Sequence, residues 1–61
     1  MTESQFTTFV ENFVRDRLLP VAETIGRIKR ADSYRAAAKQ SQSGASERVL
    51  VMLLDRALLG K

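Results

Sequence analysis

The chain has 61 residues, a formal net charge of +3 and 44% hydrophobic residues, and it contains no cysteine and no histidine. This composition is typical of a folded chain, and the length allows a single domain, residues 1–61. Disulfides and the common zinc sites are excluded. Of the usual ways to stabilise so small a domain, oligomerisation is left.

Several functional classes are excluded as well. No apolar run reaches the roughly 18 residues that span a bilayer, and the first residues lack the basic start and apolar core of a signal peptide. We therefore expect a cytoplasmic protein with no membrane partner. The sequence has no nucleotide-binding or serine-nucleophile motif, and its carboxylates lack the spacing of a metal loop. It therefore predicts no enzyme activity, no cofactor, and no catalytic or metal site.

The first predicted helix begins near Thr2, which forms a capping-box pattern with Gln5. The apolar residues that follow recur at helical spacing and lie on one arc: Phe6, Phe9, Val10, Phe13 and Val14. We interpret this arc as a core-forming face. The alternative is a docking surface for a foreign protein.

Pro20 interrupts the next stretch, because proline inside a helix removes a hydrogen bond and clashes with the carbonyl four residues back. A heptad-like seam nevertheless continues in phase through it: Val14, Leu18, Val21, Ile25 and Ile28. We therefore favour a helix kinked at Pro20, or two helices nearly in line. The alternative is a corner at which Pro20 begins a new helix.

Residues 27–40 have helical propensity and a face of small residues around a single tyrosine, which consists of Ala31, Tyr34 and Ala38. The last helix is the natural neighbour of this face. A short polar loop at 40–45 follows, in which Gly44 can adopt a positive φ. This loop should turn the chain so that the last helix packs back antiparallel.

The last helix should begin after Ser46, a good N-cap residue, and end near Gly60, where a left-handed C-cap would fall. More than half of its circumference is apolar, with a polar stripe of Arg48, Asp55 and Arg56 and with Met52 and Leu59 on the far side. This helix therefore needs partners on two sides.

A dimer would supply the missing partner. A helix over residues 3–40 would be about 57 Å long, whereas the last helix covers only about 21 Å of it. We therefore predict an all-α fold, a small bundle of three helices completed by homodimerisation, with a compact three-helix bundle as the alternative. The candidate packing and oligomer interface is Phe6, Phe9, Phe13, Val49, Leu50, Leu53, Leu54 and Leu58.

The charge is uneven, with a net of −2 in residues 1–26 and +5 in residues 27–61. A basic segment can contact phosphates or an acidic partner. The candidate contacts are Arg27, Lys29, Arg30, Tyr34, Arg35 and Lys39. These bases ring the predicted helix instead of forming one stripe, so a solvated helix is the competing interpretation.

Two functional hypotheses follow. The first is a small regulatory or adaptor protein without enzyme activity, which acts by protein–protein contact through apolar helix faces as a homo-oligomer. The second is a nucleic-acid-binding regulator that uses residues 27–39.

Overall fold

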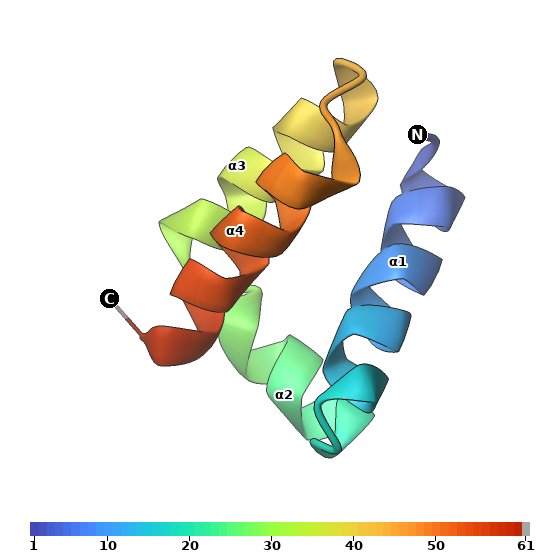
Figure 1. Ribbon diagram of the computed structural model, residues 1–61. Helices are drawn as coiled ribbons and strands as arrows, with labels where there is room; N and C mark the ends of the chain where they lie inside the picture. The colour runs from blue at the N-terminus through green and yellow to red at the C-terminus, as the bar shows by residue number, and fades with distance from the viewer. Residues whose placement is uncertain (61) are drawn as a thin grey trace.

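The computed structural model describes residues 1–60, which form four helices and no strand: α1 (Glu3–Asp16), α2 (Val21–Ile28), α3 (Asp32–Gln42) and α4 (Glu47–Leu59). The all-α class is confirmed, and the predicted count of three helices is wrong (Figure 1). The longest dimension of the molecule is 27 Å, so the chain contains no long in-line helix. It folds back on itself instead.

The start of α1 is determined locally. The Thr2 hydroxyl accepts a hydrogen bond from the Gln5 backbone N–H at 3.1 Å, and the Gln5 side-chain oxygen accepts one from the Thr2 N–H at 2.9 Å. Glu3 in the first turn adds a negative charge where the helix dipole favours it. The predicted capping box is confirmed.

The end of α1 corrects the prediction of a helix kinked at Pro20. The Leu18 N–H donates to the Arg15 carbonyl at 2.9 Å, and the Leu19 N–H donates to the Val14 carbonyl at 3.4 Å. These two bonds form a Schellman motif, which terminates the helix and turns the chain. Pro20 then lies just before α2 as its N-cap residue, which is close to the alternative of a corner.

The seam keeps its phase because α1 and α2 both bury their apolar faces in one core, not because one helix runs through Pro20. Leu18, which belongs to the predicted seam, is 93% exposed and adopts a φ of +59°. It occupies the left-handed position of the Schellman motif, where glycine is the usual residue because a Cβ is unfavourable there.

Replacing Leu18 with glycine should therefore stabilise the protein, by about 0.5–1 kcal/mol after the lost chain entropy is subtracted. The Leu18→Ala variant is the matched control, because it removes the exposed side chain and keeps the Cβ. Urea titrations of both variants measure the difference. Equal stability of the two variants would contradict a strained backbone at this position.

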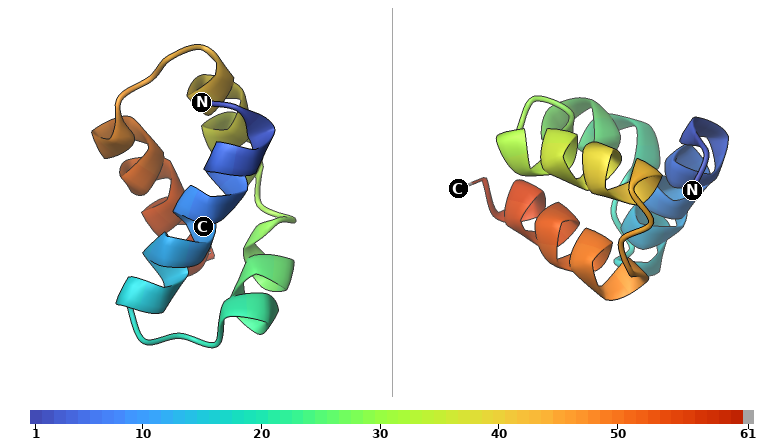
Figure 2. Two further views of the ribbon diagram at one scale, coloured as in Figure 1. Left: turned by 90° about the vertical axis from the view of Figure 1, so that its right-hand side faces the viewer. Right: turned by 90° about the horizontal axis from the view of Figure 1, so that it is seen from above.

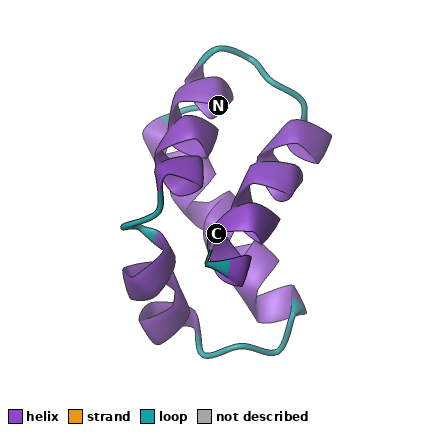
Figure 3. Ribbon diagram, turned by 90° about the vertical axis from the view of Figure 1, so that its left-hand side faces the viewer, coloured by secondary structure: helices purple, strands orange, loops and turns teal. Residues whose placement is uncertain are grey.

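A second break, between α2 and α3, was not predicted. Residues 29–31 leave the helix and form a short loop between α2 and α3 (Figure 3). Ala31 adopts extended backbone angles (φ −79°, ψ 142°) as the N-cap of α3. Every residue from 27 to 31 has adequate helix propensity, so packing and not local preference ends α2. The local sequence feature that indicates the start of α3 is the pair Asp32 and Ser33, because these residue types favour the first turn of a helix.

Helices α3 and α4 form the predicted antiparallel pair and pack on each other most extensively (Figure 1). The loop is shorter than predicted because α3 continues to Gln42, and Gly44 has the expected positive φ of 83°. Gly60 caps α4 in the left-handed conformation, as predicted. Ser46 is the N-cap of α4 by position, but its side chain makes no capping hydrogen bond.

The buried face of α3 differs from the predicted one. Ser33, Ala37 and Ser41 are its buried residues, at i, i+4 and i+8. Ala31, Tyr34 and Ala38, which were expected to face the last helix, are only partly buried. Small side chains along the buried face allow a close approach of the neighbouring helices.

One buried hydroxyl on this face has no partner: within residues 1–60, Ser33 Oγ is the buried side-chain oxygen without a hydrogen bond. Ser33→Ala should raise the free energy of unfolding by about 1 kcal/mol, because it removes an unsatisfied polar group. The melting temperature should rise by about 4–8 °C. Ser41→Ala is the control, since Ser41 Oγ donates to the Ala38 carbonyl at 2.6 Å, and it should bring no such gain. If both variants melt at the same temperature, the orphaned hydroxyl does not limit stability.

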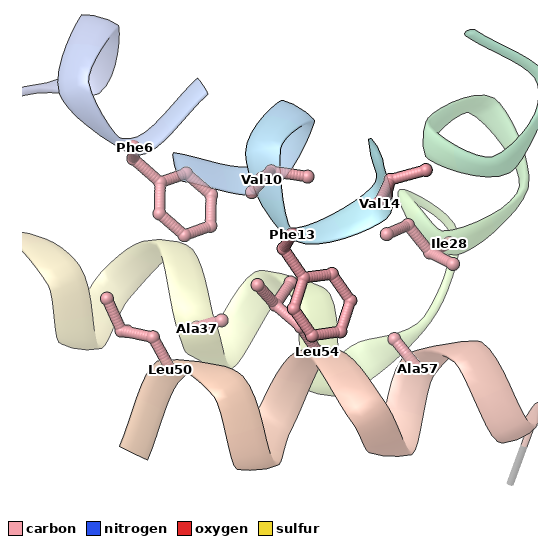
Figure 4. Packing of buried hydrophobic residues seen from close by; sticks show 9 residues of the cluster. All are labelled: Phe6, Val10, Phe13, Val14, Ile28, Ala37, Leu50, Leu54 and Ala57. Atoms are coloured by element: carbon pink, nitrogen blue, oxygen red, sulfur yellow. The ribbon is translucent and has the colours of Figure 1, made fainter. Parts of the chain in front are cut away.

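A single chain builds its own core. Side chains from all four helices meet in it, and Figure 4 shows the rings of Phe6 and Phe13 in α1 pointing toward α3 and α4. The buried hydrophobic residues are Phe6, Val10, Phe13, Val14, Ile28, Ala37, Leu50, Leu54 and Ala57.

The predicted packing and oligomer interface therefore lies largely inside one copy. Phe6, Phe13, Leu50 and Leu54 are buried in the core. The other predicted interface residues are partly buried: Phe9, Val49, Leu53 and Leu58. The prediction of a dimer assumed that one copy leaves these faces open, and the turn at 17–20 removes that premise.

Candidate docking groove

The predicted basic residues are all exposed, and they lie on different parts of the surface. Arg27 and Arg30 line a cleft beside the C-terminal end of α4, which also contains Leu58 and Leu59. Lys29 lines a separate groove on the other side of α2. Arg35 and Lys39 occupy the outward face of α3, where Arg35 lies 3.5 Å from Asp32. The fold therefore does not bring the six candidate contacts into one site.

Tyr34 has a structural position. Its ring packs edge-on against the ring of Phe6, with centroids 5.6 Å apart and an interplanar angle of 61°. Partial burial raises the pKa of the Tyr34 phenol, because it disfavours the charged form. The ring joins α1 to α3.

The groove that contains Lys29 and Tyr34 has a volume of about 620 Å³. Its walls are α1 and α2, which the 17–20 turn joins at one end, and α3 lies behind them (Figure 2, left). The apolar side chains that line it are Phe6, Val10, Val21, Ala22, Ile25, Tyr34 and Ala38. We call this feature the groove.

The edge of the groove on α1 is acidic. Glu3, Thr7 and Glu11 follow each other at intervals of four residues and line this edge, which we call the α1 rim. Four-residue spacing places them on one face of the helix, and the two carboxylates lie about 12 Å apart along the axis. Neither carboxylate has an ion-pair partner within the described part of the chain.

Gly26 forms part of the α2 wall. A Cβ built at this position would meet no heavy atom within 4 Å, so the groove is open directly beside the glycine. A larger side chain here would project into the groove without disturbing the core. Substituting Gly26 with a large residue would therefore fill the groove with its side chain.

A second exposed surface lies on α4 and consists of Arg48, Met52, Arg56 and Leu59, which we call the outer face of α4. Met52 is 56% exposed and Leu59 76% exposed. The sequence placed these two residues away from the apolar side of the helix, and the structure agrees. Asp55, the third member of the predicted polar stripe, instead pairs with Arg17 at 2.9 Å.

Sequence reasoning missed the groove, because its walls meet only if the chain turns at residues 17–20. Residues such as Glu3, Ile25 and Gly26 carry no signal by themselves. The regular spacing of Glu3, Thr7 and Glu11 was the one feature visible in the sequence.

Comparison of the chain with protein-family models, with curated proteins and with solved structures found no match. Within residues 1–60, no helix has the length and apolar character needed to cross a membrane. No three histidine, cysteine or carboxylate side chains of the described residues converge to hold a metal ion. Function has to be inferred from the surfaces described above.

Proposed function

We propose that this protein is a small adaptor or regulatory module without enzyme activity, whose groove receives an amphipathic helix of another protein chain. The groove is the observation that supports this proposal. The chain completes its core alone and still presents apolar side chains between two helices. Helix-in-groove recognition uses such a surface, with apolar anchors of the bound helix at i, i+3 or i+4, and i+7.

The charges at the edges of the groove support a peptide rather than a small molecule as occupant. Small-molecule sites place a few polar groups so that they converge on one ligand. Here Glu3 and Glu11 are spread along one edge and Lys29 lies just after the end of α2. Separated charges of this kind suit the polar flanks of a helix whose apolar face lies in the groove.

Nucleic-acid binding through residues 27–39 is the alternative. The dispersal of Arg27, Lys29, Arg30, Arg35 and Lys39 over separate surfaces weighs against it, because phosphate contacts need bases along one track. The engaged ring of Tyr34 weighs against base stacking. We therefore favour a protein partner.

A peptide selection tests the proposal. A displayed library of random helical peptides is selected on the wild-type protein alone. The enriched peptides should carry apolar residues at helical spacing and bind the wild-type protein with micromolar dissociation constants. Gly26→Phe should weaken their binding by at least about tenfold, since the phenyl ring occupies the groove.

Gly26→Ala is the matched control, because it changes the helix propensity in the same direction and leaves most of the groove open. It should retain peptide binding. If no peptide is enriched, or if Gly26→Phe binds the enriched peptides as well as the wild type does, the proposal is wrong. Circular dichroism of both variants establishes that the fold is intact.

A further inference from the structure

The outer face of α4 has the chemistry that the groove requires. Arg48 and Arg56 are eight residues apart, with Met52 midway between them, so the two guanidinium groups project about 12 Å apart along the helix. Met52 and Leu59 add two exposed apolar side chains on the same side. This face is thus an amphipathic surface with basic and apolar groups.

The α1 rim has the complementary pattern. Glu3 and Glu11 are also eight residues apart, with Thr7 midway between them, and Phe6 and Val10 line the groove beside them. Equal spacing along two helices allows both carboxylates to meet both guanidinium groups at once. Met52 would then lie opposite Thr7, and Leu59 would lie about one turn beyond Arg56.

We propose that the occupant of the groove is the outer face of α4 from a second copy of this chain. Arg48 pairs with one carboxylate of the α1 rim and Arg56 with the other. This inference rests on the proposed function, because it assigns a partner to the same groove. It differs from the predicted homodimer, since it uses exposed residues and leaves each core within one copy.

The charges of both surfaces support this pairing. Arg48, Arg56, Glu3 and Glu11 all lack an ion-pair partner within residues 1–60 of one copy. Arg48 also lies in the first turn of α4, where a positive charge opposes the helix dipole. The charge of Arg48 therefore does not stabilise α4. Contact between copies would join the acidic N-terminal part of one chain to the basic C-terminal part of the next.

The contact is heterologous, because the two surfaces belong to different parts of the molecule. Each copy in such an assembly presents a groove at one end and an outer face of α4 at the other. Charge reversal on either surface must therefore break association, and reversal on both must restore it. A symmetric contact between two α4 helices would not respond to changes on α1.

Sedimentation velocity of the full chain at about 10 mM salt, where the Debye length is about 30 Å, tests this inference. The wild type should associate as its concentration rises from micromolar to millimolar, and high salt should weaken the association. Glu3→Lys with Glu11→Lys should weaken self-association by at least about tenfold, and so should Arg48→Glu with Arg56→Glu.

An equimolar mixture of these two double variants should associate again, because each reversed surface then meets a complementary one. Arg35→Glu with Lys39→Glu is the control for net charge and should associate like the wild type. Circular dichroism checks that helicity is unchanged, since Glu3→Lys removes a favourable charge from the first turn of α1.

The outcomes separate this inference from the proposed function. A wild type that stays monomeric at millimolar concentration and low salt overturns the inference, and so does association that survives the Glu3 and Glu11 reversals. If peptides from the selection still bind the groove in a Gly26-dependent way, the proposed function stands and the partner is another protein. If they do not bind, both proposals fail.

Discussion

Replacing Leu54 with alanine is expected to lower the free energy of unfolding by about 3 kcal/mol, the usual loss for a fully buried leucine. Leu54 is 0% exposed and lies in the middle of α4, where its side chain points toward α1 (Figure 4) and belongs to the same core as Phe13. A domain of this size has a total stability of only about 3–5 kcal/mol. The variant should therefore keep at most about 2 kcal/mol of stability and unfold at a much lower urea concentration than the wild type.

Leu59→Ala is the matched control, because it makes the same chemical change on the same helix at a residue that is 76% exposed. It should change stability by less than about 0.5 kcal/mol. Urea titrations followed by far-ultraviolet circular dichroism give both values. Similar losses for the two variants would mean that α4 does not bury the face that we describe.

Arg17→Ala should lower the free energy of unfolding by about 1–2 kcal/mol, because Arg17 makes three contacts. Its guanidinium lies 3.7 Å from the centre of the Phe13 ring and donates to the Phe13 carbonyl at 3.2 Å. It also pairs with Asp55 at 2.9 Å, and the two side chains are 36% and 47% exposed. Arg17 thereby ties the end of α1 to α4.

Asp55→Asn separates these contributions, since it removes the ion pair and leaves the contact with Phe13. A pair this exposed contributes less than about 1 kcal/mol, and salt should remove most of its effect. The loss in Arg17→Ala should exceed that in Asp55→Asn and should persist at high salt. Equal losses would assign the role of Arg17 to the ion pair alone.

The ends of the chain were predictable because their signals are local. The capping box of Thr2 and Gln5 involves residues three positions apart, and the left-handed cap at Gly60 needs only a residue without a Cβ. Such contacts are complete within one turn of a helix. They can be deduced without knowledge of the rest of the fold.

The breaks between α1 and α2 and between α2 and α3 depend on packing. Leu18 adopts a conformation that glycine favours, and Ala31 ends a stretch of good helix formers. Neither residue type marks a break in the sequence. The seam through Pro20 was visible, but two helices packed in one core produce the same periodicity as one long helix.

The candidate surfaces were predictable to different degrees. The positions of Met52 and Leu59 followed from their angle on one helix, which requires no tertiary information. The groove requires α1 and α2 to lie beside each other, and this arrangement depends on the turn that was not predicted. The separation of Lys29 from Arg27 and Arg30 agrees with the prediction that these bases do not form one stripe.

A concentration series of ¹H–¹⁵N correlation spectra at low salt tests most directly the claim that one copy completes its own core. At micromolar concentration we expect one well-dispersed set of amide signals, as a folded monomer gives. On concentration, signals from the α1 rim, the groove and the outer face of α4 should shift, while those of Ala37, Leu50 and Leu54 should not. Spectra that collapse to the narrow dispersion of an unfolded chain on dilution would contradict this account, because the core would then depend on a second copy.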